Sequence, residues 1–178
     1  MNRPTTGCCL RRWRGGFLVS VLLLGPVVQA SGIRQTHILI RGQTGVIVQS
    51  AVVGAIERLE HPACAGLLEE FHASNGLTLA AHLSDLSVTP AEYLRTLWFA
   101  DADDQSVCHQ IRGPIAFTAQ GHPVVYVCGF HFVSTYQRSP AYAQILVIHE
   151  MLHAAGLGEN PPSSEQISRA AMARCSSV

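Results

Sequence analysis

Residues 149–159 of the 178-residue chain read His149-Glu150-Met151-Leu152-His153-Ala154-Ala155-Gly156-Leu157-Gly158-Glu159. Residues four positions apart lie on one face of an α-helix, so His149 and His153 can direct their imidazoles at a single point. The surrounding residues 142–157 are apolar on nearly all sides, which predicts a buried helix. Buried polar groups are costly unless they are paired. The histidines and Glu150 therefore need a partner, either a metal ion or, as the competing interpretation, a salt bridge in a metal-free core.

The metal interpretation suits zinc. Zn²⁺ binds neutral imidazole nitrogens at about 2.0–2.1 Å, and catalytic zinc sites typically use three protein ligands and leave a fourth position for water. Glu150 follows the first histidine directly, so its carboxylate can reach that water without being a ligand, as a general base does. The pattern predicts a hydrolytic zinc site with His149 and His153 as metal ligands and Glu150 as the catalytic residue.

This HExxHxxG pattern resembles the motif of the zincin metallopeptidases, and its extension resembles the metzincin branch. In that branch the glycine lets the chain turn sharply after the helix, so that a ligand three residues later returns to the zinc. Gly156 takes the glycine position, and Glu159 stands where the branch has a histidine. A carboxylate is also a zinc ligand. The resemblance implies Glu159 as the third ligand, and three substitutes stay open: His131, His122 and Glu165.

The resemblance also implies an α+β fold, a mostly helical zincin-like single domain with a small β-hairpin or sheet and a central HExxH helix. The implied activity is hydrolysis of a peptide or protein substrate, which an edge strand near the metal binds by β-augmentation. Residues 115–118 and 124–128 predict a β-hairpin that is the candidate for this edge. Tyr136 and Tyr142 are candidate hydrogen-bond donors to the developing oxyanion, or else ordinary packing residues.

The first 30 residues have the organisation of a secretory signal peptide. Arginines at positions 3, 11, 12 and 14 precede an apolar block over 17–28, and Val28-Gln29-Ala30 fits a cleavage site. The apolar block is shorter than the roughly 20 residues that a membrane-spanning helix needs, which favours a signal over an anchor. We predict a signal peptide over 1–30, a zinc metallopeptidase-like domain over 31–178, a secreted or periplasmic location, and no stable membrane insertion after cleavage.

Charge and cysteine content agree with export. Beyond residue 30 the chain keeps eight arginines and no lysine against twelve acidic residues, a net charge of about −4. Such a chain does not attract a phosphate backbone, so no nucleic-acid partner is expected. Four cysteines remain and allow three pairings. We favour Cys108 with Cys128 at the base of the hairpin and Cys64 with Cys175 between an early helix and the last one. Zinc ligation by cysteine competes, but no CxxC spacing is present.

Shorter patterns place the other elements. In chain order they predict a strand over 36–40, helices over 46–59, 62–72 and 89–98, a helical or extended piece over 77–86, and a last helix over 163–175. Asp101, Asp103 and Asp104 indicate a solvated loop, with calcium binding as the alternative. The second hairpin strand is expected to reach the motif helix through a short connection.

Two other functions fit the same motif. One is an exported zinc-binding interaction or structural domain without turnover, in which a fourth protein ligand such as His131 or His122 closes the site. The other is a zinc hydrolase that acts on something other than peptide. Neither the cleavage specificity nor the oligomeric state follows from any pattern in the sequence.

Overall fold

The computed structural model describes residues 36–178, and the predicted signal peptide lies outside the described residues. The elements follow in this order: β1 (His37–Ile38), α1 (Gly42–Glu60), α2 (Pro62–Ala65), the 3₁₀ helix η1 (Gly66–Glu69), α3 (Leu79–Asp85), α4 (Pro90–Thr96), β2 (Trp98–Asp101), the 3₁₀ helix η2 (Ser106–His109), β3 (Ala116–Phe117), β4 (Val124–Val127), α5 (Gly129–Arg138), α6 (Pro140–Ala154) and α7 (Ser164–Cys175). Helices predominate over one small sheet. The predicted α+β class is therefore confirmed.

The four strands form a mixed sheet in the order β1-β2-β4-β3. The first three are parallel, with Phe99 of β2 opposite Val125 of β4, and β3 runs antiparallel to β4, with Phe117 opposite Tyr126. Side chains alternate along the central strands, so Phe99 and Val125 are buried whereas Trp98 and Tyr126 are not. One face of the sheet thus packs on the helices, as in other two-layer folds. The short strand β3 forms one edge.

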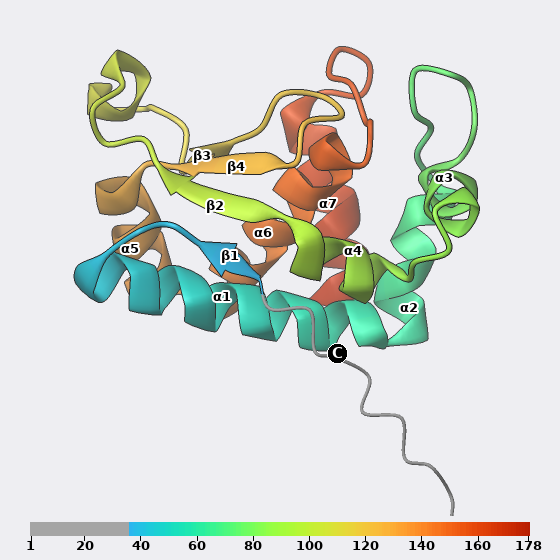
Figure 1. Cartoon of the computed structure of the whole chain (residues 1–178), viewed down its shortest axis with the longest axis horizontal. Coiled ribbons are helices and arrows are strands. Elements are labelled where there is room, and N and C mark those ends of the chain that lie inside the picture. The colour runs from blue at the N-terminus through green and yellow to red at the C-terminus, as the bar shows by residue number, and fades with distance from the viewer. Residues whose placement is uncertain (1–35) are drawn as a thin grey trace, which may run out of the picture. The chain divides into compact units, whose positions relative to one another are not determined.

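The motif helix α6 lies at the centre of the helical layer. It packs on α1, α5 and α7 as well as on β3 and β4, and Figure 1 shows α1 running below the sheet. α1 contributes Val48, Val52 and Leu59, which recur at helical spacing and are fully or almost fully buried. α6 begins as predicted at Ser139-Pro140, where the Ser139 hydroxyl oxygen accepts a hydrogen bond from the backbone nitrogen of Tyr142. Its burial explains why its residues are apolar on nearly every side.

Most predicted helices and the β3–β4 hairpin are confirmed, but the connection from the hairpin to α6 was predicted wrongly. It contains α5, a ten-residue helix. Its aromatic and β-branched residues favour a strand by propensity, and no side chain of its own caps it. The cap comes from far away, because Oδ1 of Asp103 accepts a hydrogen bond from the backbone nitrogen of Gly129 at 2.6 Å. This helix therefore depends on tertiary contacts.

Strand β2 was also missed. The sequence predicted a helix to residue 98 and then a loop, whereas α4 ends at Thr96 and residues Trp98–Asp101 form the strand between β1 and β4. Both partners of β2 are distant in sequence, so no local pattern marks it. The segment over 62–72 is likewise only α2 followed by η1, and the undecided piece over 77–86 contains α3.

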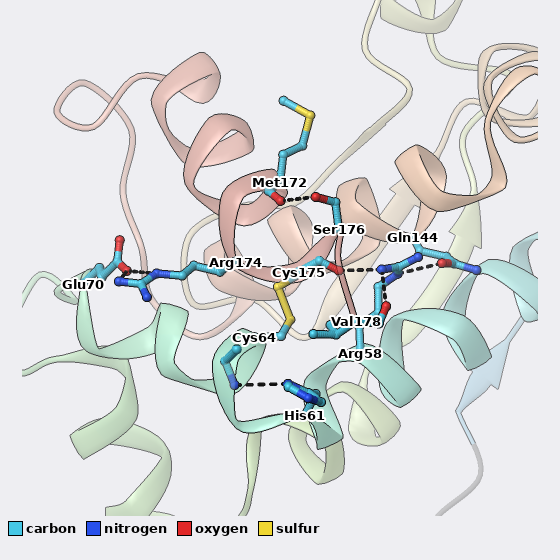
Figure 2. Close-up of a disulfide and its surroundings, with 11 residues drawn as sticks. Arg58, His61, Cys64, Glu70, Gln144, Met172, Arg174, Cys175, Ser176 and Val178 are labelled. Atoms are coloured by element: carbon cyan, nitrogen blue, oxygen red, sulfur yellow. Dashed lines mark hydrogen bonds and ion pairs between the residues drawn. A yellow bond between two sulfur atoms is a disulfide. The ribbon is translucent and has the colours of Figure 1, made fainter.

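Both favoured disulfides are present. Cys64 pairs with Cys175, and Cys108 pairs with Cys128. Figure 2 shows the first of them between α2 and the end of α7, where Arg58 also donates hydrogen bonds to the backbone oxygens of Cys175 and, at 2.7 Å, Val178. The C-terminal end of α7 is therefore fixed by a disulfide and by hydrogen bonds from the Arg58 guanidinium.

Two observations bear on location. Disulfides form and persist in oxidising compartments, which agrees with the predicted export. Among residues 36–178, no helix has the length and apolar character needed to cross a membrane.

Candidate metal centre

The last turns of α6 bring the two motif histidines together. The Nε2 atoms of His149 and His153 lie 3.0 Å apart, and both side chains are buried. Their other ring nitrogens are also bonded, Nδ1 of His149 to Oγ of Ser168 at 3.0 Å and Nδ1 of His153 to the backbone oxygen of Leu157 at 2.9 Å. The two rings therefore have fixed orientations and share one focus.

A turn after α6 returns the chain to this focus. Gly156 has φ +107°, a conformation that side-chain-bearing residues rarely adopt, so the glycine permits the turn. The backbone nitrogen of Leu157 donates to the oxygen of Leu152 at 3.0 Å, and Leu157 is buried. Glu159 then follows with Oε1 3.5 Å from Nε2 of His153. The carboxylate is partly exposed to solvent, with 44% of the side chain accessible.

The three donor groups fit a metal ion. His149, His153 and Glu159 each offer one ligand atom, and these atoms lie within 4.8 Å of one another. Ligands about 2.0–2.1 Å from a tetrahedral zinc stand about 3.3 Å apart, close to the 3.0 Å and 3.5 Å separations on either side of His153. Two nitrogens and one carboxylate oxygen form a donor set that zinc accepts. This arrangement is a candidate metal site.

Glu150 is the least satisfied residue of the site. Its side chain is buried, and Oε2 has no hydrogen-bond partner among residues 36–178. Burial raises the pKa of this carboxyl to about 8, and the charge of Glu159 acts in the same direction. The Thr118 side chain lies close enough to lower the pKa again, although its hydroxyl oxygen completes no hydrogen bond. A buried carboxyl oxygen without a hydrogen-bond partner is an exception, and a cation or a water molecule beside it would satisfy it.

Burial shifts the pKa of His149 in the opposite direction from that of Glu150. It lowers the pKa of this imidazole to about 4, and the neighbouring His153 lowers it further. The ring is therefore neutral at physiological pH. Metal ions bind the neutral form of histidine, so the environment of His149 favours coordination.

The site opens into a cleft of about 410 Å³. One wall is the edge strand β3 with Pro114 and Thr118 on its two sides, and the other is α6 with the turn that carries Glu159. The hairpin turn is tied to the end of α6, because Nε2 of Gln120 donates to the oxygen of Gly156 at 2.7 Å. The cleft therefore lies between a sheet edge and the metal ligands.

The three substitutes for Glu159 lie outside this group. His131 is on α5, where its Nε2 lies 3.1 Å from the backbone oxygen of Gln110, and His122 is exposed in the hairpin turn. Glu165 points to solvent and pairs with Arg169 at 2.5 Å. In the part of the chain that the structure describes, His149, His153 and Glu159 are the group of three or more such residues that could hold a metal.

Other sequence candidates also lie elsewhere. Tyr136 packs against the hydrophobic core from α5, and Tyr142 is exposed in the first turn of α6. Neither lines the cleft. Of the aspartates between β2 and η2, Asp101 accepts a hydrogen bond from the backbone nitrogen of Asp103, and Asp103 caps α5. The solvated-loop interpretation therefore fits these residues.

Three residues at the site were not anticipated. Ser168 reaches His149 from α7, nineteen positions away, while Thr118 and Gln120 come from the hairpin. A serine on the inner face of a helix and polar residues in a hairpin carry no signal for such roles. Only the packing of α7 and the hairpin against α6 reveals them.

Comparison with known proteins gives no match, whether with family models, with curated proteins or with solved structures. The geometry of the site gives a histidine, histidine and glutamate group that can hold a metal ion, beside a buried carboxyl and an open cleft.

Proposed function

We propose that this protein is an exported zinc-dependent peptidase. His149, His153 and Glu159 would hold Zn²⁺, and Glu150 would act as the general base. When bound, the ion would supply Lewis-acid polarisation of the scissile carbonyl and a lowered pKa for the attacking water. These roles agree with the resemblance of the motif to zincin metallopeptidases.

The observation that carries the proposal is the unpaired Oε2 of Glu150. A general base needs a free lone pair within reach of the proton that it removes. Oε2 is buried and makes no hydrogen bond, while its residue lines the same cleft as the two histidines. A carboxyl with a purely structural role would be expected to pair both oxygens. Glu150 would take a proton from the attacking water and pass it to the leaving amine.

The edge strand supports a peptide as substrate. Among the described strands β3 pairs with β4 alone, and Ala116, Phe117 and Thr118 line the cleft. An extended peptide can add to such an edge through backbone hydrogen bonds, which would place a scissile bond along the cleft. The predicted negative charge of the exported chain makes a nucleic-acid substrate a poor alternative.

The test combines metal content with turnover. We expect the purified protein to hold about one zinc and to cleave an unstructured protein or a fluorogenic peptide library, with activity lost on chelation. Glu150→Gln should keep zinc but lose about 10²–10⁴-fold in kcat, as expected for a general base. Glu159→Ala should lose zinc affinity, whereas Glu165→Ala, which removes an exposed acid six positions further along the chain, serves as the control and should change neither property.

Three results would oppose the proposal. Activity that survives Glu150→Gln would remove the general base. Zinc binding without cleavage of any peptide would favour the structural zinc domain. Cleavage of an ester or amide but of no peptide would favour a hydrolase of another substrate class.

A further inference from the structure

The two histidines of the site differ in what holds their second ring nitrogen. Nδ1 of His153 faces the backbone oxygen of Leu157, and Nδ1 of His149 faces Oγ of Ser168. A carbonyl oxygen can only accept a hydrogen bond, whereas a hydroxyl can donate or accept. The partner of His153 is therefore fixed in its role, and the partner of His149 is not.

These roles determine where the ring protons lie. His153 must carry its proton on Nδ1 to donate to Leu157, so its Nε2 bears a lone pair. The Nε2 atoms of the two rings are 3.0 Å apart, and two lone pairs at that distance repel. Without a metal, His149 must carry its proton on Nε2 and donate it to His153. Its Nδ1 then accepts a hydrogen bond from the Ser168 hydroxyl.

Metal binding moves the ring proton to the other nitrogen in His149 but not in His153. A coordinated His149 presents the lone pair of Nε2 to the ion, so the proton of the neutral ring must sit on Nδ1. Ser168 then has to accept instead of donate. His153 needs no change, because its Nε2 already bears a lone pair.

We infer that Ser168 is a positioning residue that keeps Nδ1 of His149 hydrogen-bonded in both tautomers, so that the site can exchange between metal-free and metal-bound forms without leaving this buried nitrogen unpaired. The inference rests on the proposed metal site and concerns a residue outside the motif. A residue that only donates or only accepts would satisfy one of the two forms. Serine satisfies both because its hydroxyl proton rotates.

Contacts along α7 fix the position of Ser168. Its neighbour Ile167 is fully buried, and α7 begins with a capping box between Ser163 and Gln166. The far end of the same helix is tied by the Cys64–Cys175 disulfide and by the ion pair between Arg174 and Glu70, as Figure 2 shows. The hydroxyl therefore comes from a rigid element, as a residue that orients a ligand requires.

The experiment compares three variants of the purified protein. Ser168→Ala removes the hydroxyl, Ser168→Thr keeps it, and Ser176→Ala removes the hydroxyl of the residue after α7, which donates to the backbone oxygen of Met172. Zinc affinity is measured by chelator competition and site geometry by the visible spectrum of bound Co²⁺. We expect Ser168→Ala to lose about 10–100-fold in zinc affinity, as is usual for partners of metal-bound histidines. Ser168→Thr should recover most of it, and Ser176→Ala should match the parent.

NMR of the histidine ring nitrogens shows which nitrogen carries the proton, and this position does not follow from correct folding alone. We expect the proton of His149 to lie on Nε2 in the metal-free parent and on Nδ1 after zinc is added, while His153 keeps its proton on Nδ1 throughout. An Nδ1 proton on His149 in both forms would overturn the inference, as would equal zinc affinities for Ser168→Ala and the parent. A parent that binds no zinc would instead overturn the proposed function, and the inference with it.

Discussion

The two ends of α7 meet opposite kinds of surroundings. At its C-terminal end, which we call the locked end and define by Arg58, Cys64, Glu70, Arg174 and Cys175, there are a disulfide, an ion pair and hydrogen bonds from a guanidinium. At its N-terminal end it borders the cleft, where Ser164 is one of the lining residues.

The cleft, unlike the locked end, contains buried polar atoms that have no hydrogen-bond partner among the described residues. Among residues 36–178, the buried side-chain polar atoms without a hydrogen-bond partner are Oγ1 of Thr118 and Oε2 of Glu150, and both residues line the cleft. Unpaired buried atoms destabilise a fold, so they persist where the structure around them is rigid enough and a ligand can use them. α7 therefore connects a strongly stabilised region at its C-terminal end to a site at its N-terminal end that lowers the stability of the fold.

Removal of disulfides should give the largest effect. Cys64 and Cys175 are 111 positions apart, and Cys108 and Cys128 are 20 apart. Loop entropy assigns about 4–5 kcal/mol to the longer loop and about 3 kcal/mol to the shorter one. The double variant Cys64→Ala/Cys175→Ala should therefore lose more free energy of unfolding in urea than Cys108→Ala/Cys128→Ala. The reverse order would mean that the locked end does not dominate stability.

Arg58→Lys should weaken the locked end without breaking its covalent bond. Nε of Arg58 donates to Oε1 of Gln144 at 2.8 Å, and Nη1 serves two backbone oxygens. A lysine cannot reproduce this fork, so we expect a loss of about 2–3 kcal/mol in urea unfolding. Arg169→Lys is the matched control, because its exposed pair with Glu165 should contribute less than about 0.5 kcal/mol. Equal losses of unfolding free energy in the two variants would contradict the stabilising role given to the Arg58 hydrogen bonds.

The unpaired carboxyl in the cleft should make the free energy of unfolding of the metal-free protein, prepared with a chelator, depend on pH. A carboxyl with a raised pKa binds its proton more tightly when folded, so stability falls as the pH rises from about 4.5 to about 8. The lowered pKa of His149 acts in the opposite direction, but only between about 4 and 6.5. Between pH 6.5 and 8 we therefore expect a loss of about 2 kcal/mol, at about 1.4 kcal/mol per pH unit.

Glu150→Gln should remove this loss, since a glutamine does not titrate. Urea unfolding at several pH values measures it. An unchanged slope in the variant would show that another group is responsible.

Thr118→Val tests the smaller unpaired group. It replaces a buried hydroxyl that lacks a partner by a methyl group of similar size, so stability should rise by up to about 1 kcal/mol. Thr96→Val is the control. Its hydroxyl donates to the oxygen of Tyr93 at 2.7 Å, and its loss should lower stability by about 1 kcal/mol. A decrease in both variants would mean that the Thr118 hydroxyl is satisfied in solution.

Local chemistry in the sequence determined the motif helix and its cap, the spacing of His149 and His153, and the hairpin. These features involve neighbours within a few residues, so propensity and periodicity specify them. The two disulfide pairings were also predicted, because each joins segments whose packing the element order suggested.

The tertiary structure alone decided the rest. It placed Glu159 beside the histidines and the three alternatives elsewhere, because the turn at Gly156 returns Glu159 to the end of α6. It formed α5 with a cap from Asp103 and placed Ser168 against His149, in each case through contacts between residues nineteen or more positions apart. Contacts at such separations depend on how whole elements pack, and no short window of sequence contains that information.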